Sequence, residues 1–314
     1  MNASLRMTAL LSLPLITAIV QAENTLYGTN AGINLTGDFN TLIGENAGQS
    51  GTSANYNTMI GNNAGGTTST QYSDDAVLIG LEAGYSTTSG ADATMLGTRA
   101  GKNSNQTDNT FLGFEAGLTN TSGYDLTYLG SGAGYSAAER HNNTFVGYHA
   151  GYYVSYNKNT AIGSEAMRGT SPSADTHAST AIGYRSAYGL GSGDGNTTIG
   201  ESAGADLNDG AYNTFVGARA GEKSQDTNSD GSSYIYESST FVGALAGVDT
   251  SDGAYSNIFL GAAAGSGNQT GDHNVAIGAF ADFGSWDLTE VEIEAVFTAE
   301  SGGSTGATVQ DASP

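Results

Sequence analysis

Hydrophobic and polar residues alternate along this chain in one short pattern, which is clearest between Asn143 and Gly151. In most copies, Thr and an Ile, Leu or Val flank a variable residue, a Gly follows, and an Ala stands three residues after that Gly. Alternation with a period of two is typical of a β-strand. We therefore expect every copy to contain a short strand that ends at the glycine.

Fifteen copies of the pattern follow one another between residues 24 and 282. Their first glycines, taken as anchors, are Gly28, Gly44, Gly61, Gly80, Gly97, Gly113, Gly130, Gly147, Gly163, Gly183, Gly200, Gly217, Gly243, Gly261 and Gly278. The commonest interval is 17 residues, which is too short for a helical hairpin repeat and fits one coil of a β-solenoid. The sequence predicts an all-β fold, a parallel β-roll or β-solenoid of about fifteen coils of 16–17 residues.

Two further positions recur. The residue four before the anchor is Asn in ten copies, and a second Gly follows the Ala in twelve. Glycine adopts positive φ angles and allows close backbone approach, so we expect both glycines to form corners of a flattened coil. Adjacent strands of a sheet lie about 4.8 Å apart, so fifteen stacked coils would form a rod about 70 Å long.

The alternation also divides each strand between two faces. If the Thr and the aliphatic residue point into the coil, the variable residue between them points outward and forms a candidate oligomer-interface ladder. Its members are Leu42, Met59, Leu78, Met95, Phe111, Tyr128, Phe145, Phe215, Phe241 and Phe259. So large an apolar surface is rarely left exposed, and rotated copies of the chain would cover it. The opposite assignment, with Phe145 buried and Thr144 and Val146 outside, stays open from sequence alone.

Composition excludes several classes of protein. The 47 glycines follow no Gly-X-Y period, which excludes collagen, and the absence of cysteine excludes disulfides and a thiol nucleophile. The formal net charge of −22 would repel nucleic acid and anionic membranes.

The sequence offers no constellation for catalysis. The four histidines lack metal-ligand spacing, and the Gly-rich stretches lack the strand–loop–helix context that phosphate binding requires. We therefore predict a protein that is not an enzyme and needs no cofactor. Asp-rich turns such as Asp74-Asp75 are explained by turn chemistry, while loose calcium binding stays open.

The two ends of the chain differ from the repeats. Residues 1–22 have the features of a signal peptide, with an apolar run too short to span a bilayer, and predict a secreted or bacterial cell-surface protein. The solenoid is expected over 23–284, without a bilayer-spanning segment in the mature chain. Residues 285–300 alternate apolar and acidic positions, as a capping strand or as a donor strand that pairs with the next molecule in a filament. Residues 301–314 are expected to be disordered.

Insertions lengthen three of the intervals, at residues 66–75, 168–178 and 222–239. Insertions in solenoids often emerge on one face and carry binding function. The last one contains Tyr234, Ile235 and Tyr236, which form a candidate ligand loop. An inert surface loop is the alternative.

Residues 274–278 (Asn-Val-Ala-Ile-Gly) and 159–163 (Asn-Thr-Ala-Ile-Gly) resemble the head repeats of trimeric autotransporter adhesins, the YadA-like heads. They are also similar to repeats of bacterial tail-fibre-like surface proteins. The resemblance extends over residues 24–282. It implies a left-handed parallel β-roll, three chains in each head, and attachment to host matrix or to other cells.

Together these features predict a secreted or surface-displayed structural and adhesive repeat protein. It would form a homo-oligomeric rod, a trimer by the resemblance, and would contact an unknown host or cell-surface ligand. One alternative is a subunit that assembles head to tail into a filament. The other is an ice-binding β-solenoid with an exposed Thr column, for which Thr94, Thr110, Thr127, Thr144 and Thr160 would align on adjacent coils.

Overall fold

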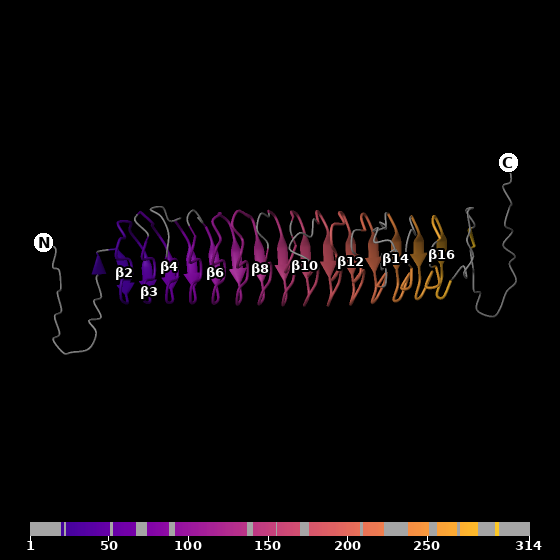
Figure 1. Ribbon diagram of the computed structural model, residues 1–314, viewed down its shortest axis with the longest axis horizontal. Coiled ribbons are helices and arrows are strands. Elements are labelled where there is room, and N and C mark those ends of the chain that lie inside the picture. The colour runs from indigo at the N-terminus through magenta and orange to yellow at the C-terminus, as the bar shows by residue number, and fades with distance from the viewer. Residues whose placement is uncertain are drawn as a thin grey trace, which may run out of the picture.

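The computed structural model describes residues 20–21, 23–50, 53–66, 74–87, 92–136, 141–154, 156–169, 176–207, 210–222, 238–250, 256–268, 271–281 and 293–294 of the 314-residue chain. These residues form an elongated rod of stacked coils, with the strands side by side along its length (Figure 1). The ligand loop at residues 234–236, the predicted tail and nearly all of the predicted signal peptide lie outside the described residues.

Within the described residues, the strands form one sheet of seventeen. They are β1 (Val20–Gln21), β2 (Asn24–Tyr27), β3 (Thr41–Ile43), β4 (Thr58–Ile60), β5 (Val77–Ile79), β6 (Thr94–Leu96), β7 (Thr110–Leu112), β8 (Thr127–Leu129), β9 (Thr144–Val146), β10 (Thr160–Ile162), β11 (Thr180–Ile182), β12 (Thr197–Ile199), β13 (Thr214–Val216), β14 (Thr240–Val242), β15 (Ile258–Leu260), β16 (Val275–Ile277) and β17 (Ile293–Glu294). From β2 to β16 each strand pairs in parallel with the next. The predicted parallel β-solenoid is confirmed.

The pairing keeps the repeat in register. Tyr128 of β8 lies opposite Phe145 of β9, and Phe145 lies opposite Ala161 of β10. Each position of the repeat therefore forms a column along the rod, even where the intervals between anchors differ. At the two ends, β1 pairs antiparallel with β2, and β17 pairs parallel with β16.

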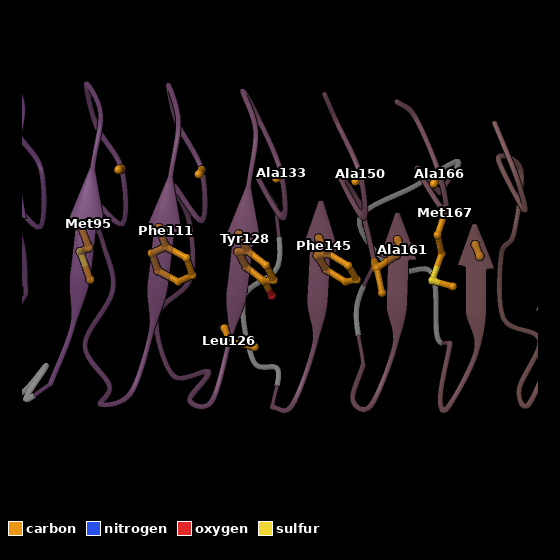
Figure 2. Close-up of a cluster of buried hydrophobic side chains, with 14 of the residues drawn as sticks. Met95, Phe111, Leu126, Tyr128, Ala133, Phe145, Ala150, Ala161, Ala166 and Met167 are labelled. Atoms are coloured by element: carbon orange, nitrogen blue, oxygen red, sulfur yellow. The ribbon is translucent and has the colours of Figure 1, made fainter. Parts of the chain in front are cut away.

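The predicted orientation of the candidate interface ladder is wrong. Its members, from Leu42 to Phe259, are all between 0 and 2% exposed within a single chain. Figure 2 shows Met95, Phe111, Tyr128 and Phe145 on successive strands at the same level inside the coil. These side chains belong to the core and are not available to a partner. The opposite assignment, which the alternation also allowed, is the correct one.

The size of the opposite wall explains this orientation. The residue three after the anchor is Ala in fourteen coils, fully buried in most of them, as Ala133 and Ala150 are, and a glycine follows it in twelve. Where the wall consists of Ala and Gly, it leaves room for one large side chain in the coil. A buried aromatic side chain removes more apolar area from water than Thr or Val would, so the large residue takes the inward position.

The buried rings stack along the rod. The centroids of Phe111 and Tyr128 are 5.0 Å apart, and those of Tyr128 and Phe145 are 4.9 Å apart. A second run joins Phe215, Phe241 and Phe259 at 4.7 and 4.8 Å. These separations follow the spacing between strands, so in-register pairing also sets the ring contacts.

A column of asparagines satisfies the backbone inside the coil. The Asn159 N–H donates to Oδ1 of Asn143 at 2.8 Å, and the Asn213 N–H donates to Oδ1 of Asn196 at 3.0 Å. Where Ser179 replaces Asn, its hydroxyl oxygen accepts from the Asn196 N–H at 3.1 Å. Buried backbone N–H groups require hydrogen-bond acceptors, which explains why Asn recurs at the position before the strand.

The anchor glycines stack so closely that a side chain cannot be added. A Cβ on Gly113, whose φ is +141°, would lie 2.5 Å from the carbonyl oxygen of Gly130 in the next coil.

We expect Gly113→Ala to lower the free energy of unfolding by about 1–3 kcal/mol, because backbone strain and the clash act together. Urea unfolding of the wild type and the variant, followed by circular dichroism, measures the difference in the free energy of unfolding. Ala218→Ser, on an exposed corner, is the control and should change stability by less than about 0.5 kcal/mol. Equal effects of the two substitutions would contradict the close stacking.

Candidate interaction surfaces

The outer face of the sheet carries two columns that run from β2 to β16, which we call the Thr/aliphatic face. One column is made of the residue before the buried ladder position, which is Thr in twelve copies, and the other of the residue after it, which is Ile, Leu or Val in fourteen. These side chains are half-buried or exposed; Leu96 and Leu112 are each 41% exposed, and Ile277 is 52% exposed. The face is therefore an accessible surface on which an aliphatic column runs beside a column made mostly of Thr.

The dimensions of this face follow from strand geometry. Fifteen strands about 4.8 Å apart, with two side-chain columns about 10 Å wide in total, give roughly 700 Å². The largest apolar patch on a typical soluble monomer measures about 300–600 Å². Because the columns are in register, the same pair of side chains is presented at every step along the rod.

A second surface feature lies on the corners that follow strands β8 to β11. We define the aromatic–arginine cluster as Tyr135, His149, Tyr152, Tyr153, Arg168 and Tyr188. Four of these, Tyr135, Tyr152, Arg168 and Tyr188, each stand five residues after an anchor glycine, so the stacking of coils brings them together. All six are half-buried.

The guanidinium of Arg168 lies among three rings. Its Cζ atom is 5.7 Å from the ring centroids of Tyr152 and Tyr153, and 5.5 Å from that of Tyr188. Its Nη1 donates a hydrogen bond of 3.0 Å to the Tyr188 hydroxyl. Tyr135 stacks in parallel on Tyr152 at 4.7 Å. These contacts hold the guanidinium in a fixed position.

Arg168 differs from its neighbours in charge compensation. Arg99, Lys102, Arg185 and Arg219 form ion pairs with Glu115, Glu82, Glu165 and Glu222. In the part of the chain that the structure describes, Arg168 has no carboxylate within ion-pair distance, and its Nε is buried without a hydrogen-bond partner. A cation without a carboxylate partner is unexpected on so acidic a protein.

The same surroundings shift the protonation of His149. Burial lowers the pKa of His149 below its ordinary 6.5, the charge of Arg168 lowers it further, and Glu165 acts in the opposite direction. Burial also raises the pKa of Tyr152, with smaller contributions from Tyr135 and Tyr153. At neutral pH His149 and Tyr152 are therefore uncharged, and Arg168 is the cation of the cluster.

The structure bears differently on the Thr column, on metal binding and on the aromatic–arginine cluster. The Thr column that the ice-binding alternative requires does lie on the outer face, where Thr94 is exposed and Thr144 half-buried. No group of three His, Cys, Asp or Glu residues that could hold a metal occurs among the described residues. Sequence reasoning missed the aromatic–arginine cluster, although Tyr, Tyr, Arg and Tyr occupy one position of four successive repeats.

None of the described residues belongs to a helix that is long and apolar enough to cross a bilayer. Comparisons of this chain with protein-family models, with curated proteins and with solved structures find no match.

Proposed function

We propose that the chain is a secreted or surface-displayed structural rod that assembles with copies of itself and contacts cells or matrix. The observation that carries the proposal is the Thr/aliphatic face, because it is long and regular and has an accessible aliphatic column along its length. Three chains around a common axis, as in the adhesin heads that the repeats resemble, would cover the faces of all three. The Thr/aliphatic face therefore replaces the buried ladder as the proposed oligomer interface.

The size of the face supports self-assembly. A stable interface commonly buries about 800 Å² on each partner, and the two columns alone supply roughly 700 Å² before their flanks are counted. Every copy presents the same columns at the same spacing, so a rotation about the rod axis can bring equivalent residues together along its length. A rigid rod with an acidic outer surface then remains soluble while it displays its corners and loops.

Lysines placed on this face test the assembly. We expect the triple variant Leu96→Lys, Leu112→Lys and Ile162→Lys to remain folded, because all three side chains are partly exposed, but to dissociate into single chains. Burying three unpaired charges in an interface costs several kcal/mol. Multi-angle light scattering reports the mass, and circular dichroism reports the fold.

The matched control places three lysines elsewhere on the rod. Leu81, Phe114 and Tyr148 are exposed residues on the corner after the anchor glycine, outside the Thr/aliphatic face. The triple variant with Lys at these positions should keep the wild-type mass. If the face variant keeps the wild-type mass, or if the control dissociates equally, the proposed interface is wrong.

Ice binding is the second candidate, because the structure places the Thr column outside. Thr94, Thr110 and Thr127 pair in register on adjacent strands, beside an equally regular aliphatic column. Such a face would have to be free in solution. Thermal hysteresis from a monomeric preparation would favour ice binding over assembly, whereas an oligomer without thermal hysteresis would favour the structural rod.

A further inference from the structure

We propose that the aromatic–arginine cluster is a binding site for an acidic polysaccharide, in which carboxylate or sulfate groups are spaced along the sugar chain. The inference deepens the proposed adhesive role by naming a ligand chemistry, and it rests on that role only for its biological setting. The site itself lies within one chain, on the corners that follow β8 to β11.

The charge and the fixed position of Arg168 favour an anionic ligand. A guanidinium presents N–H donors in a plane that matches a carboxylate or a sulfate. Here the guanidinium is positioned by Tyr152, Tyr153 and Tyr188, while no carboxylate of the described residues pairs with it. Because its orientation is already set by the rings, little conformational entropy would be lost when an oxyanion binds.

Exposed tyrosine rings beside the cluster favour a sugar ligand. Tyr148 and Tyr184 are 51% and 47% exposed, one coil before and one coil after Arg168. Tyr148 joins the cluster by stacking on His149 at 3.8 Å, and Arg185 bridges Tyr184 and Tyr188 with its guanidinium 5.2 and 5.1 Å from their centroids. Exposed tyrosines pack against the apolar faces of sugar rings, and their hydroxyls exchange hydrogen bonds with sugar hydroxyls.

The low charge density of an acidic polysaccharide distinguishes this ligand from other polyanions. The chain carries a net charge of −22, and Glu165 lies beside the cluster in an ion pair with Arg185. A nucleic acid or an anionic bilayer would bring dense negative charge against this acidic surface and be repelled. A polysaccharide with one charge for every two sugars can place one carboxylate on Arg168 and neutral rings on the tyrosines.

The test uses the full secreted chain and immobilised hyaluronan, which carries one carboxylate per disaccharide. We expect saturable binding that weakens as salt is added, and no binding to neutral dextran. Arg168→Met removes the charge and keeps an apolar side chain among the rings, and it should weaken binding about tenfold or more. Arg168→Lys should bind with intermediate affinity, because it restores charge without the planar donors.

Two further variants keep the test decisive if Arg168→Met folds poorly. Tyr148→Ala and Tyr184→Ala change exposed side chains and should each weaken binding several-fold with unchanged circular dichroism. Arg219→Met, which breaks the pair with Glu222 outside the cluster, is the control and should bind as the wild type does. Binding that survives Arg168→Met, Tyr148→Ala and Tyr184→Ala, equal binding to dextran, or tighter binding to DNA would overturn the proposal.

The outcome is separable from that of the assembly experiment. If the lysine variant of the Thr/aliphatic face becomes monomeric and still binds hyaluronan, both proposals hold. If the wild-type chain is a monomer that binds hyaluronan through Arg168, only the assembly proposal fails. If the wild-type oligomer does not bind hyaluronan, only the polysaccharide site fails.

Discussion

Phe241→Ala is expected to lower the free energy of unfolding by about 3–5 kcal/mol, which is the usual cost of deleting a fully buried aromatic side chain. Phe241 is 0% exposed and stacks on Phe215 and Phe259 with centroids 4.7 and 4.8 Å away. The coil cannot collapse into the space, because the backbone of each coil is held by its pairing with the next. The cavity would therefore remain and add to the lost burial.

Urea unfolding of the wild type and the variant, followed by circular dichroism, measures the loss as a lower midpoint. The matched control is Leu81→Ala, which truncates a 47% exposed apolar residue on a corner and should cost less than about 0.5 kcal/mol. If Phe241→Ala and Leu81→Ala shift the midpoint equally, the inward orientation of the aromatic ladder is wrong.

Ala161→Phe is expected to destabilise the chain by about 1–3 kcal/mol through overpacking, and Met167→Gly in the same chain should relieve it. Most coils combine a large ladder residue with a glycine at the second corner. Gly117 shows why: with φ at +62°, its Cβ would lie 2.8 Å from the ring of Phe111. The coil of β10 reverses the combination, because Ala161 is small and a fully buried Met167 replaces the glycine (Figure 2).

Met167→Gly alone should also destabilise, because it leaves a cavity beside Ala161 that is larger than a methyl group. The double variant Ala161→Phe with Met167→Gly restores the commoner combination and should be more stable than either single variant. The coupling energy from the double-mutant cycle is expected to be about 1–3 kcal/mol in the favourable direction. Additive effects would show that the two side chains do not share one space.

The sequence was sufficient to predict the repeat, the strand in each coil and the parallel stacking, because these depend on period alone. It did not determine which face of the strand is inside. Alternation separates Phe145 from Thr144 and Val146, but the choice between them depends on how much room the opposite wall leaves. The small Ala150 and Gly151 of that wall were visible in the sequence, and their sizes could have been used to decide.

The aromatic–arginine cluster was missed for a different reason. Four of its members, at one position of successive repeats, are separated by 16–20 residues and become neighbours only when the coils stack in register. The interval after Gly163 is longer than the commonest one of 17 residues, yet Arg168 and Tyr188 still meet, because the extra residues lie after Arg168 and before the next strand. Tabulating every position against its anchor, including those beyond the strand, would have revealed the column.

The mass of the wild-type chain in solution tests the central claim, that copies of the chain cover the Thr/aliphatic face of the rod. Native mass spectrometry at micromolar concentration should give a multiple of the single-chain mass, and a threefold multiple if the rod is built like the adhesin heads that it resembles. A folded chain that stays at the single-chain mass would contradict the claim.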